Sequence, residues 1–159
     1  MDYKKNILEI TGEAQNHLKI DEIDVISLDL DGNDNYFVRE LLNHQVHPKL
    51  FIVEYNAKFI PPIEFEIQYN ETHIWTGDDY FGASLTSFVK LFAEFNYSLI
   101  CCNSGTGANA FFIQDKYLHH FADIPKDILT LYSPPRYHLP KNYGHPQSIK
   151  TLEALFYMD

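Results

Sequence analysis

Cysteine is scarce in this chain of 159 residues: there are two, Cys101 and Cys102, and they are neighbours. Adjacent residues of a strand point to opposite faces, which argues against an ordinary structural disulfide between them, and buried reduced thiols are expected. None of the eight histidines combines with a cysteine or a second carboxylate at metal-ligand spacing, so the sequence predicts no metal site. No serine lies in a nucleophile elbow, which argues against a hydrolase triad.

Basic residues are also few, with 12 Lys and Arg against 22 Asp and Glu and a formal net charge of −10. They are scattered and form no basic stripe, so we expect no binding to nucleic acid. No apolar run approaches the roughly 18 residues of a membrane helix, and the first residues lack the apolar core of a signal peptide. We therefore expect no membrane association and a cytoplasmic location.

What is present is an ordinary globular composition, 45% hydrophobic and 21% charged, in a length that suits one domain over residues 1–159. The apolar pattern favours an α/β fold, beginning with a helix over residues 3–20. Ile23–Leu30 is apolar almost without interruption, which predicts a central parallel strand. A helix capped by Asn33 or Asp34 and ending near Asn43 then leads to a second buried strand over Lys49–Tyr55.

A long connection over residues 57–81 has no clean period, and loops of this length in a compact domain are usually functional. It contains His73 and Trp75, which are candidates to cover a bound substrate. A well-patterned helix over Ser84–Phe95 follows. Strands over residues 97–103 and 109–114 are separated by a short glycine-rich turn, so we expect an antiparallel hairpin at the sheet edge. Short helices and proline-rich segments make up the rest.

Polar side chains gather where the predicted strands end. Ligands of open parallel sheets bind outside the carboxyl ends of the strands, so these side chains predict one common site. Asp29 and Asp31 are the predicted catalytic residues. With Asp34 they place three acids within six residues, and this local repulsion favours a bound cation, a donor-rich ligand or a shifted pKa. The whole candidate set is Asp29, Asp31, Asn33, Glu54, Asn56, Ser84, Asn103 and Asn109.

Two enzyme classes share the motif Asp29-Leu30-Asp31-Gly32. A phosphatase of the haloacid-dehalogenase kind would use Asp29 as nucleophile, Asp31 as acid/base and Mg²⁺, with Gly77–Asp79 imitating its distal metal carboxylates. Against this class, Asn33 stands where its motif has threonine, and no buried strand precedes Gly77. A nucleotide-sugar glycosyltransferase would use the paired carboxylates to hold Mn²⁺, but that motif is common by chance and the chain is short for such a fold.

Longer segments carry a third interpretation. "IDVISLDLDGNDNYFVRELL" followed by "PKLFIVEYNA", together with "YFGASLTSFVKLFAEFNYSLICCNSGTGANAFFI", resembles FkbM-type S-adenosylmethionine-dependent methyltransferases. The resemblance implies a partial Rossmann-like methyltransferase sheet, strands four to seven of seven, with parallel strands, an antiparallel C-terminal hairpin and helices packed on the sheet. Residues 22–121 would be this core and residues 122–159 a proline-rich C-terminal extension. The glycine-rich cofactor loop of the family is absent before Asp24.

The resemblance also implies a function and residue roles. The ancestral activity is methyl transfer from S-adenosylmethionine to a hydroxyl of a sugar or small metabolite, in a chain that is truncated or degenerate. Asp31 and Asn33 would orient the methionine end of the cofactor or the acceptor. The acceptor side would comprise Glu54, Asn56, Ser84, Asn103 and Asn109. The alternative is a non-catalytic binding or assembly subunit. In either case, a homodimer contact or a partner chain is expected to cover the sheet edge beside the first strand.

Overall fold

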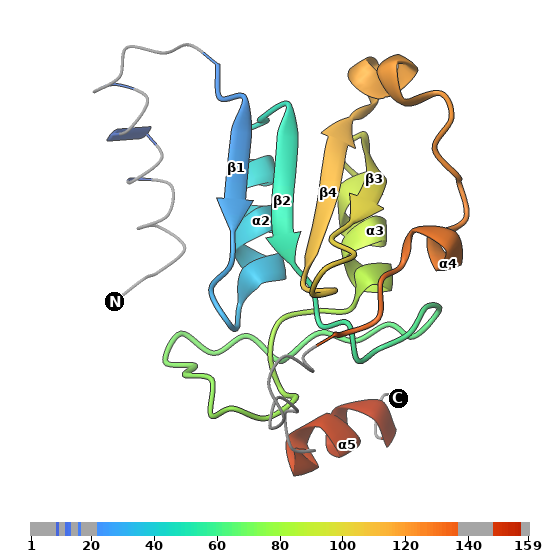
Figure 1. The fold of residues 1–159 in the computed structure, drawn as a ribbon. Helices are drawn as coiled ribbons and strands as arrows, with labels where there is room; N and C mark the ends of the chain where they lie inside the picture. The colour runs from blue at the N-terminus through green and yellow to red at the C-terminus, as the bar shows by residue number, and fades with distance from the viewer. Residues whose placement is uncertain (1–8, 10–11, 14–15, 17–21, 137–147, 157–159) are drawn as a thin grey trace.

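A four-stranded mixed sheet with helices packed on it forms the centre of the computed structural model, which describes residues 9, 12–13, 16, 22–136 and 148–156 (Figure 1). The strands lie in the order β1 (Val25–Leu28), β2 (Leu50–Glu54), β4 (Asn109–Gln114) and β3 (Tyr97–Cys102). The helices are α2 (Asp34–Asn43), α3 (Leu85–Ala93), the 3₁₀ helix η1 (Asp115–Phe121), α4 (Ile128–Leu131) and α5 (Ile149–Phe156). The predicted α/β class is confirmed, whereas the helix expected over residues 3–20 falls mostly outside the described residues.

Strand pairing brings the expected polar ends to one edge. β1 and β2 are parallel, and β4 is antiparallel to both β2 and β3, which confirms the predicted hairpin. β3 therefore runs in the same direction as β1 and β2, with β4 inserted between β2 and β3. In this register Glu54, the last residue of β2, lies opposite Asn109, the first residue of β4.

The main core lies between the sheet and the helices α2 and α3, which both pack behind the sheet in Figure 1. Alternate residues of β2 and β4 point into it, and Phe51, Val53 and Phe112 are fully buried. The helices contribute the apolar stripes expected from the sequence, among them Leu41 and Phe88. Each such side chain contributes about 1.5–3 kcal/mol on burial, so this layer fixes the positions of the strand ends.

β1 departs from its predicted place. Its nearly continuous apolar sequence predicts a central strand, but within the described residues β1 lies at one edge of the sheet. Only alternate residues face the core: Leu28 is buried, whereas Val25 and Ser27 are exposed. The cysteines also depart in part from expectation. Both are free, but Cys101 is exposed and Cys102 half-buried.

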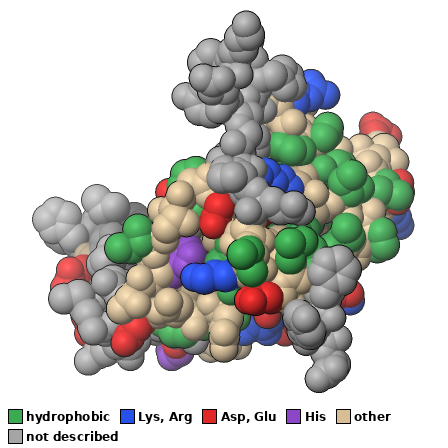
Figure 2. Space-filling model, turned by 90° about the horizontal axis from the view of Figure 1, so that it is seen from below, with side chains coloured by type: hydrophobic (Ala, Val, Ile, Leu, Met, Phe, Trp, Pro, Cys, Tyr) green, Lys and Arg blue, Asp and Glu red, His purple; other side chains and the backbone are tan. Residues whose placement is uncertain are grey.

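The predicted long connection packs across the carboxyl ends of the strands and meets α5. A second small core of Phe59, Phe65 and Ile67 joins the connection to the apolar side of α5. The buried Asp79 side chain accepts hydrogen bonds from the Ser148 backbone N–H at 2.7 Å and the Thr151 hydroxyl at 2.8 Å, which anchors α5. Figure 2 views this end of the molecule, where basic side chains are scattered rather than clustered. No helix among the described residues is long and apolar enough to cross a membrane.

Candidate functional site

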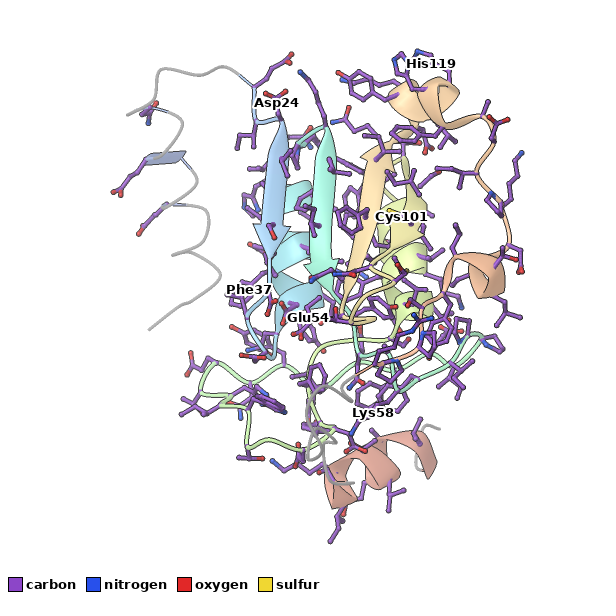
Figure 3. The ribbon with its side chains drawn as sticks, viewed as in Figure 1. Asp24, Phe37, Glu54, Lys58, Cys101 and His119 are labelled. Carbon is purple, nitrogen blue, oxygen red and sulfur yellow. The ribbon has the colours of Figure 1, made fainter. Side chains whose placement is uncertain are left out.

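The carboxylates that end β1 and β2 converge on one point. One carboxylate oxygen each from Asp29, Asp31 and Glu54 lies within 4.8 Å of the others, and we call these three residues the carboxylate cluster. Glu54 sits at the lower end of β2 in Figure 3, where β1 also ends. Asp29 and Asp31 are exposed and Glu54 is half-buried. The predicted convergence of acidic groups from two strands is therefore present in the structure.

Asp34 shapes the turn that carries two of these groups. Its fully buried carboxylate accepts hydrogen bonds from the backbone N–H groups of Leu30 and Gly32, each at 2.9 Å. These bonds hold the turn that contains Asp31, whose φ of 53° is in the left-handed region. Asn33 is the N-cap residue of α2, but its side chain makes no capping bond. Asp34 thus stabilises the turn before α2 by accepting hydrogen bonds from two backbone N–H groups of that turn.

Electrostatic repulsion and burial change the chemistry of the cluster. Burial, followed by the negative charges of Asp29, Asp34 and Asp31, raises the pKa of Glu54 to about 8. Its Oε2 atom is buried and has no hydrogen-bond partner among the described residues. Burial and the neighbouring Asp31 also raise the pKa of Asp29, while a hydrogen bond from Glu54 opposes that rise. A protonated Glu54 therefore donates to Asp29, and the pair can take up or release a proton near neutral pH.

Three amide and hydroxyl residues of the predicted site are engaged in holding the connection. The Asn33 side chain donates to the Asn70 carbonyl at 2.8 Å and accepts from the Asn70 N–H at 3.3 Å. Ser84, fully buried, caps α3 through the Ser87 N–H and also accepts from the Phe65 N–H at 3.1 Å. These contacts give Asn33 and Ser84 a structural role. Asn56, the third of these residues, also has one.

Asn56 is buried completely, and all its side-chain hydrogen-bonding groups have backbone partners. Its amide nitrogen donates to the carbonyls of Asp79 at 2.9 Å and Phe81 at 3.1 Å, and its oxygen accepts from the Lys58 N–H at 3.3 Å. We expect Asn56→Leu to lower the free energy of unfolding by about 3 kcal/mol, because two buried carbonyls and one N–H lose their partners. Urea denaturation measures the change. Asn43→Leu, on the exposed end of α2, is the control and should change stability little.

Strand pairing places the hairpin asparagines, Asn103 and Asn109, next to the carboxylate cluster. The Asn103 N–H donates to the Asn109 carbonyl at 2.7 Å, and Asn109 is the register partner of Glu54. The Asn103 side chain accepts from the Gly105 N–H at 2.8 Å, which fixes the turn. Asn103 and Asn109 therefore belong to the same edge as Asp31 and Glu54, with Asn103 turned toward its own loop.

His73, which the sequence offered only as a covering residue, packs directly on the acidic turn. A Cβ atom added at Gly32 would lie 2.5 Å from Cδ2 of the His73 ring. The ring Nε2 atom is buried without a hydrogen-bond partner among the described residues. Burial lowers the pKa of His73, although a hydrogen bond with the Asp31 carbonyl opposes the effect. No sequence signal could have identified this contact, because His73 and Gly32 are joined only by the packing of the connection.

The Gly32–His73 contact predicts non-additive mutations. Gly32→Ala must displace the His73 ring, so we expect a loss of about 1–2 kcal/mol in unfolding free energy. In a His73→Ala background the same substitution should cost less than half as much, since the obstructing ring is gone. A double-mutant cycle by urea denaturation measures the coupling. Equal costs in both backgrounds would contradict the contact.

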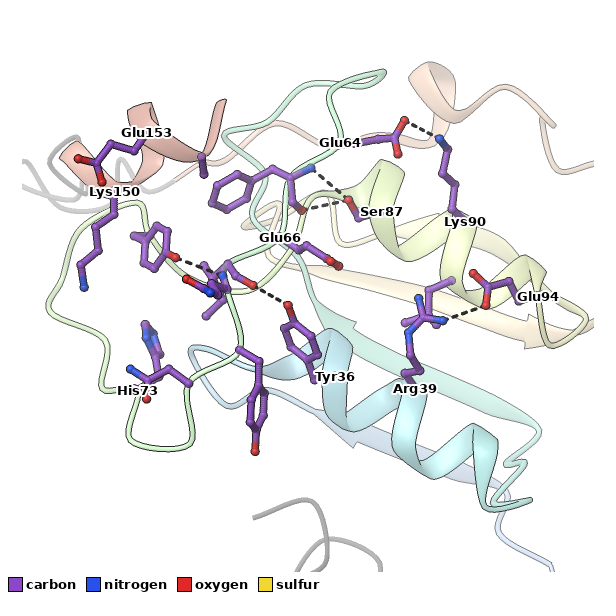
Figure 4. Close-up of a pocket in the computed structure, with 18 residues that line it drawn as sticks. Tyr36, Arg39, Glu64, Glu66, His73, Ser87, Lys90, Glu94, Lys150 and Glu153 are labelled. Carbon is purple, nitrogen blue, oxygen red and sulfur yellow. Dashed lines mark hydrogen bonds and ion pairs between the residues drawn. The ribbon is translucent and has the colours of Figure 1, made fainter. Parts of the chain in front are cut away.

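A cavity of about 850 Å³ lies between α2, α3, the connection and α5, with Asn70 and His73 in its lining (Figure 4). Ion pairs connect its walls: Arg39 of α2 with Glu94 of α3 at 2.9 Å, and Lys90 of α3 with Glu64 at 2.5 Å. None of the eight predicted site residues lines it. The carboxylate cluster, which has the perturbed proton chemistry, is therefore the better candidate site.

The cluster can accept hydrogen bonds from hydroxyl groups, exchange a proton, or surround a divalent cation with carboxylate oxygens. The sequence predicted no metal site, since no histidine stands at ligand spacing from a cysteine or a second carboxylate, and Glu54 is distant in the chain from Asp29 and Asp31. Only the fold brings the three together. No protein-family model and no curated protein matches this chain, so the candidate site rests on the described geometry.

Proposed function

We propose that this chain is a methyltransferase-like protein of the FkbM type, and that the described residues form the acceptor side of its site. The acceptor is a sugar or small metabolite with a free hydroxyl. The observation that carries the proposal is the convergence of Asp29, Asp31 and Glu54 at the carboxyl edge of two parallel strands. The mixed sheet with its antiparallel C-terminal hairpin supports it further, because this is the arrangement that the sequence resemblance implies.

The roles of the residues follow from their exposure and proton affinity. Asp29 and Asp31 are exposed and accept hydrogen bonds from acceptor hydroxyls. Glu54, whose pKa is about 8, can take up the proton that a hydroxyl loses on alkylation only in its ionised form, so this role requires a pH near or above 8. Asn109 lies beside Glu54 and offers an amide at the same edge.

S-adenosylmethionine fits the described residues only in part. Its methionine end carries positive charges that suit Asp31, but Asn33, the second residue assigned to it, is held by Asn70. The turn at 103–108 leads into β4 and not into a helix, so it offers no anion site for a nucleotide. No described residues form a glycine-rich loop at a helix start. We therefore assign no step to the cofactor and limit the proposal to the acceptor.

A partner chain would supply what the described residues lack. The outer edge of β1 is unpaired among the described residues, and its free N–H and C=O groups form a ready template for pairing with another chain. A homodimer or a different chain at this edge remains our proposal. A monomer at high concentration in size-exclusion chromatography with light scattering would count against the homodimer.

Two titrations of the full chain test the acceptor role. In ¹⁵N NMR spectra, a panel of methyl glycosides should shift the backbone amides of residues 29–34 and 54, and Asp29→Asn with Asp31→Asn should abolish these shifts. In calorimetry, S-adenosylmethionine should bind more weakly than about 100 µM, equivalent to about −5.5 kcal/mol. If the glycosides cause no shifts in these amides, the acceptor role is wrong. If S-adenosylmethionine binds more tightly than this, the proposal should not be limited to the acceptor.

A second candidate function, the magnesium-dependent phosphatase, is favoured by one observation: the carboxylate cluster can surround a cation. The expected distal carboxylates do not join it. Asp79 is bonded to the start of α5, and Asp78 accepts a hydrogen bond from the Tyr80 N–H at 3.0 Å. We expect no hydrolysis of p-nitrophenyl phosphate with Mg²⁺. Turnover that disappears in Asp29→Asn would reverse this ranking.

A further inference from the structure

A second cavity shares no residue with the carboxylate cluster. This cavity of about 660 Å³ is enclosed by α3, β3, η1 and α4, and Figure 1 shows the segment from η1 to α4 running beside β3. We call it the apolar groove. Its volume is in the range of small-molecule sites, about 300–1,000 Å³. Most of its lining is apolar and half-buried: Val89, Leu99, Leu118, Phe121, Ile124, Ile128 and Leu131.

The few charged groups of the groove have one sign. Lys126 lines it, together with His119, and no acidic residue does, although the chain carries a net charge of −10. Two acidic residues of the adjacent segment lie outside the lining. Asp127 is engaged as the cap of α4, bonded to the Thr130 N–H at 3.1 Å, and Asp123 is exposed. Lys126 makes no ion pair within the described part of the chain.

From this combination we infer that the apolar groove binds a free single-chain carboxylate, a fatty acid of medium length. Its hydrocarbon chain would lie against the aliphatic walls, and its carboxylate would meet Lys126 at the rim. A cationic amphiphile lacks a partner for its head group in this lining, and a flat polar ligand would leave the aliphatic walls exposed. The groove would thus give the protein a lipid-derived ligand in addition to its hydroxyl acceptor.

Calorimetry with octanoate, decanoate and dodecanoate, each below its critical micelle concentration, tests the inference. Each added methylene should lower Kd by up to about fourfold until the groove is filled, as expected from about 0.8 kcal/mol per buried methylene. Dodecyltrimethylammonium should bind at least tenfold more weakly than dodecanoate. A Kd independent of chain length, or equal for the two head groups, would overturn the inference.

Variants locate the ligand. Lys126→Glu should weaken dodecanoate binding at least fivefold, whereas Lys116→Glu, the same charge change at an η1 residue outside this groove, should not. Ala93→Trp, at an exposed position on the groove wall, should fill the groove and abolish binding, while Asn43→Trp on α2 leaves it intact. In the unaltered protein, dodecanoate should shift the amides of residues 118–131 in ¹⁵N spectra. Shifts elsewhere alone, or equal losses in both lysine variants, would contradict the assignment.

Discussion

We expect Glu54→Gln to raise the free energy of unfolding at pH 8.5 by about 2 kcal/mol and to change it little at pH 5. The reason is the raised pKa of Glu54, about 8 in the fold against 4.5 ordinarily. Between these values the unfolded chain releases the proton while the folded chain retains it, so stability falls as pH rises through this window. At about 1.4 kcal/mol per pKa unit the upper limit is about 5 kcal/mol, and partial exposure reduces it.

Urea denaturation at pH 5, 7 and 8.5 measures this effect. Asp29 and Asp34 also have a raised pKa, so the variant should still lose some stability with rising pH, but less steeply than the unaltered protein. Glu71→Gln, which removes the same charge from an exposed loop residue, should give a profile parallel to that of the unaltered protein. If the stability profile of Glu54→Gln against pH is also parallel to that of the unaltered protein, the surroundings of Glu54 do not suppress its ionisation.

Asp34→Ala should cost about 3 kcal/mol in unfolding free energy and release the acidic turn. The substitution leaves the N–H groups of Leu30 and Gly32 without their acceptor, and hydrogen bonds to a charged group contribute about 1.5–3 kcal/mol each. Relief from burying the Asp34 carboxylate offsets part of the loss, because burial raises its pKa. Once the turn is released, Asp29 and Asp31 move away from Glu54, whose pKa should then fall toward its ordinary value.

Asp34→Asn separates these contributions, because it keeps one acceptor oxygen without the charge. It should lose less stability than Asp34→Ala at pH 7. Asp123→Ala, at an exposed position, is the control for loss of an acidic side chain. An Asp34→Ala protein within 0.5 kcal/mol of the unaltered one would show that the turn holds its shape without this carboxylate.

The sequence predicted those parts of the fold that depend on local pattern. Apolar runs ending in polar residues located the ends of β1 and β2, and the glycine-rich turn predicted the β3–β4 hairpin. It did not predict that β1 lies at an edge of the described sheet, because a continuous apolar run reads alike in a central strand and in an edge strand.

Contacts between residues that are distant in the chain could not be predicted from the sequence. Asn33 and Asn56 stand at strand ends and were predicted to bind ligand, but they hold backbone groups of the connection more than 20 residues away. The proton chemistry of Glu54 depends equally on distance in space, since its neighbours Asp29 and Asp31 come from another strand. The sequence pattern correctly identified the carboxyl ends of the strands as the place where polar side chains gather. It could not predict which of these side chains hold the fold and which are available to a ligand.

The titration of the Glu54 carboxyl carbon, followed by ¹³C NMR in protein labelled at its side-chain carboxyl groups, tests the carboxylate cluster most directly. The convergence of three acidic groups predicts a midpoint about 8, which falls when Asp29 is replaced by asparagine. A midpoint near 4.5 that does not respond to Asp29→Asn would mean that Glu54 stands apart from the aspartates, and the proposed acceptor site would lose its basis.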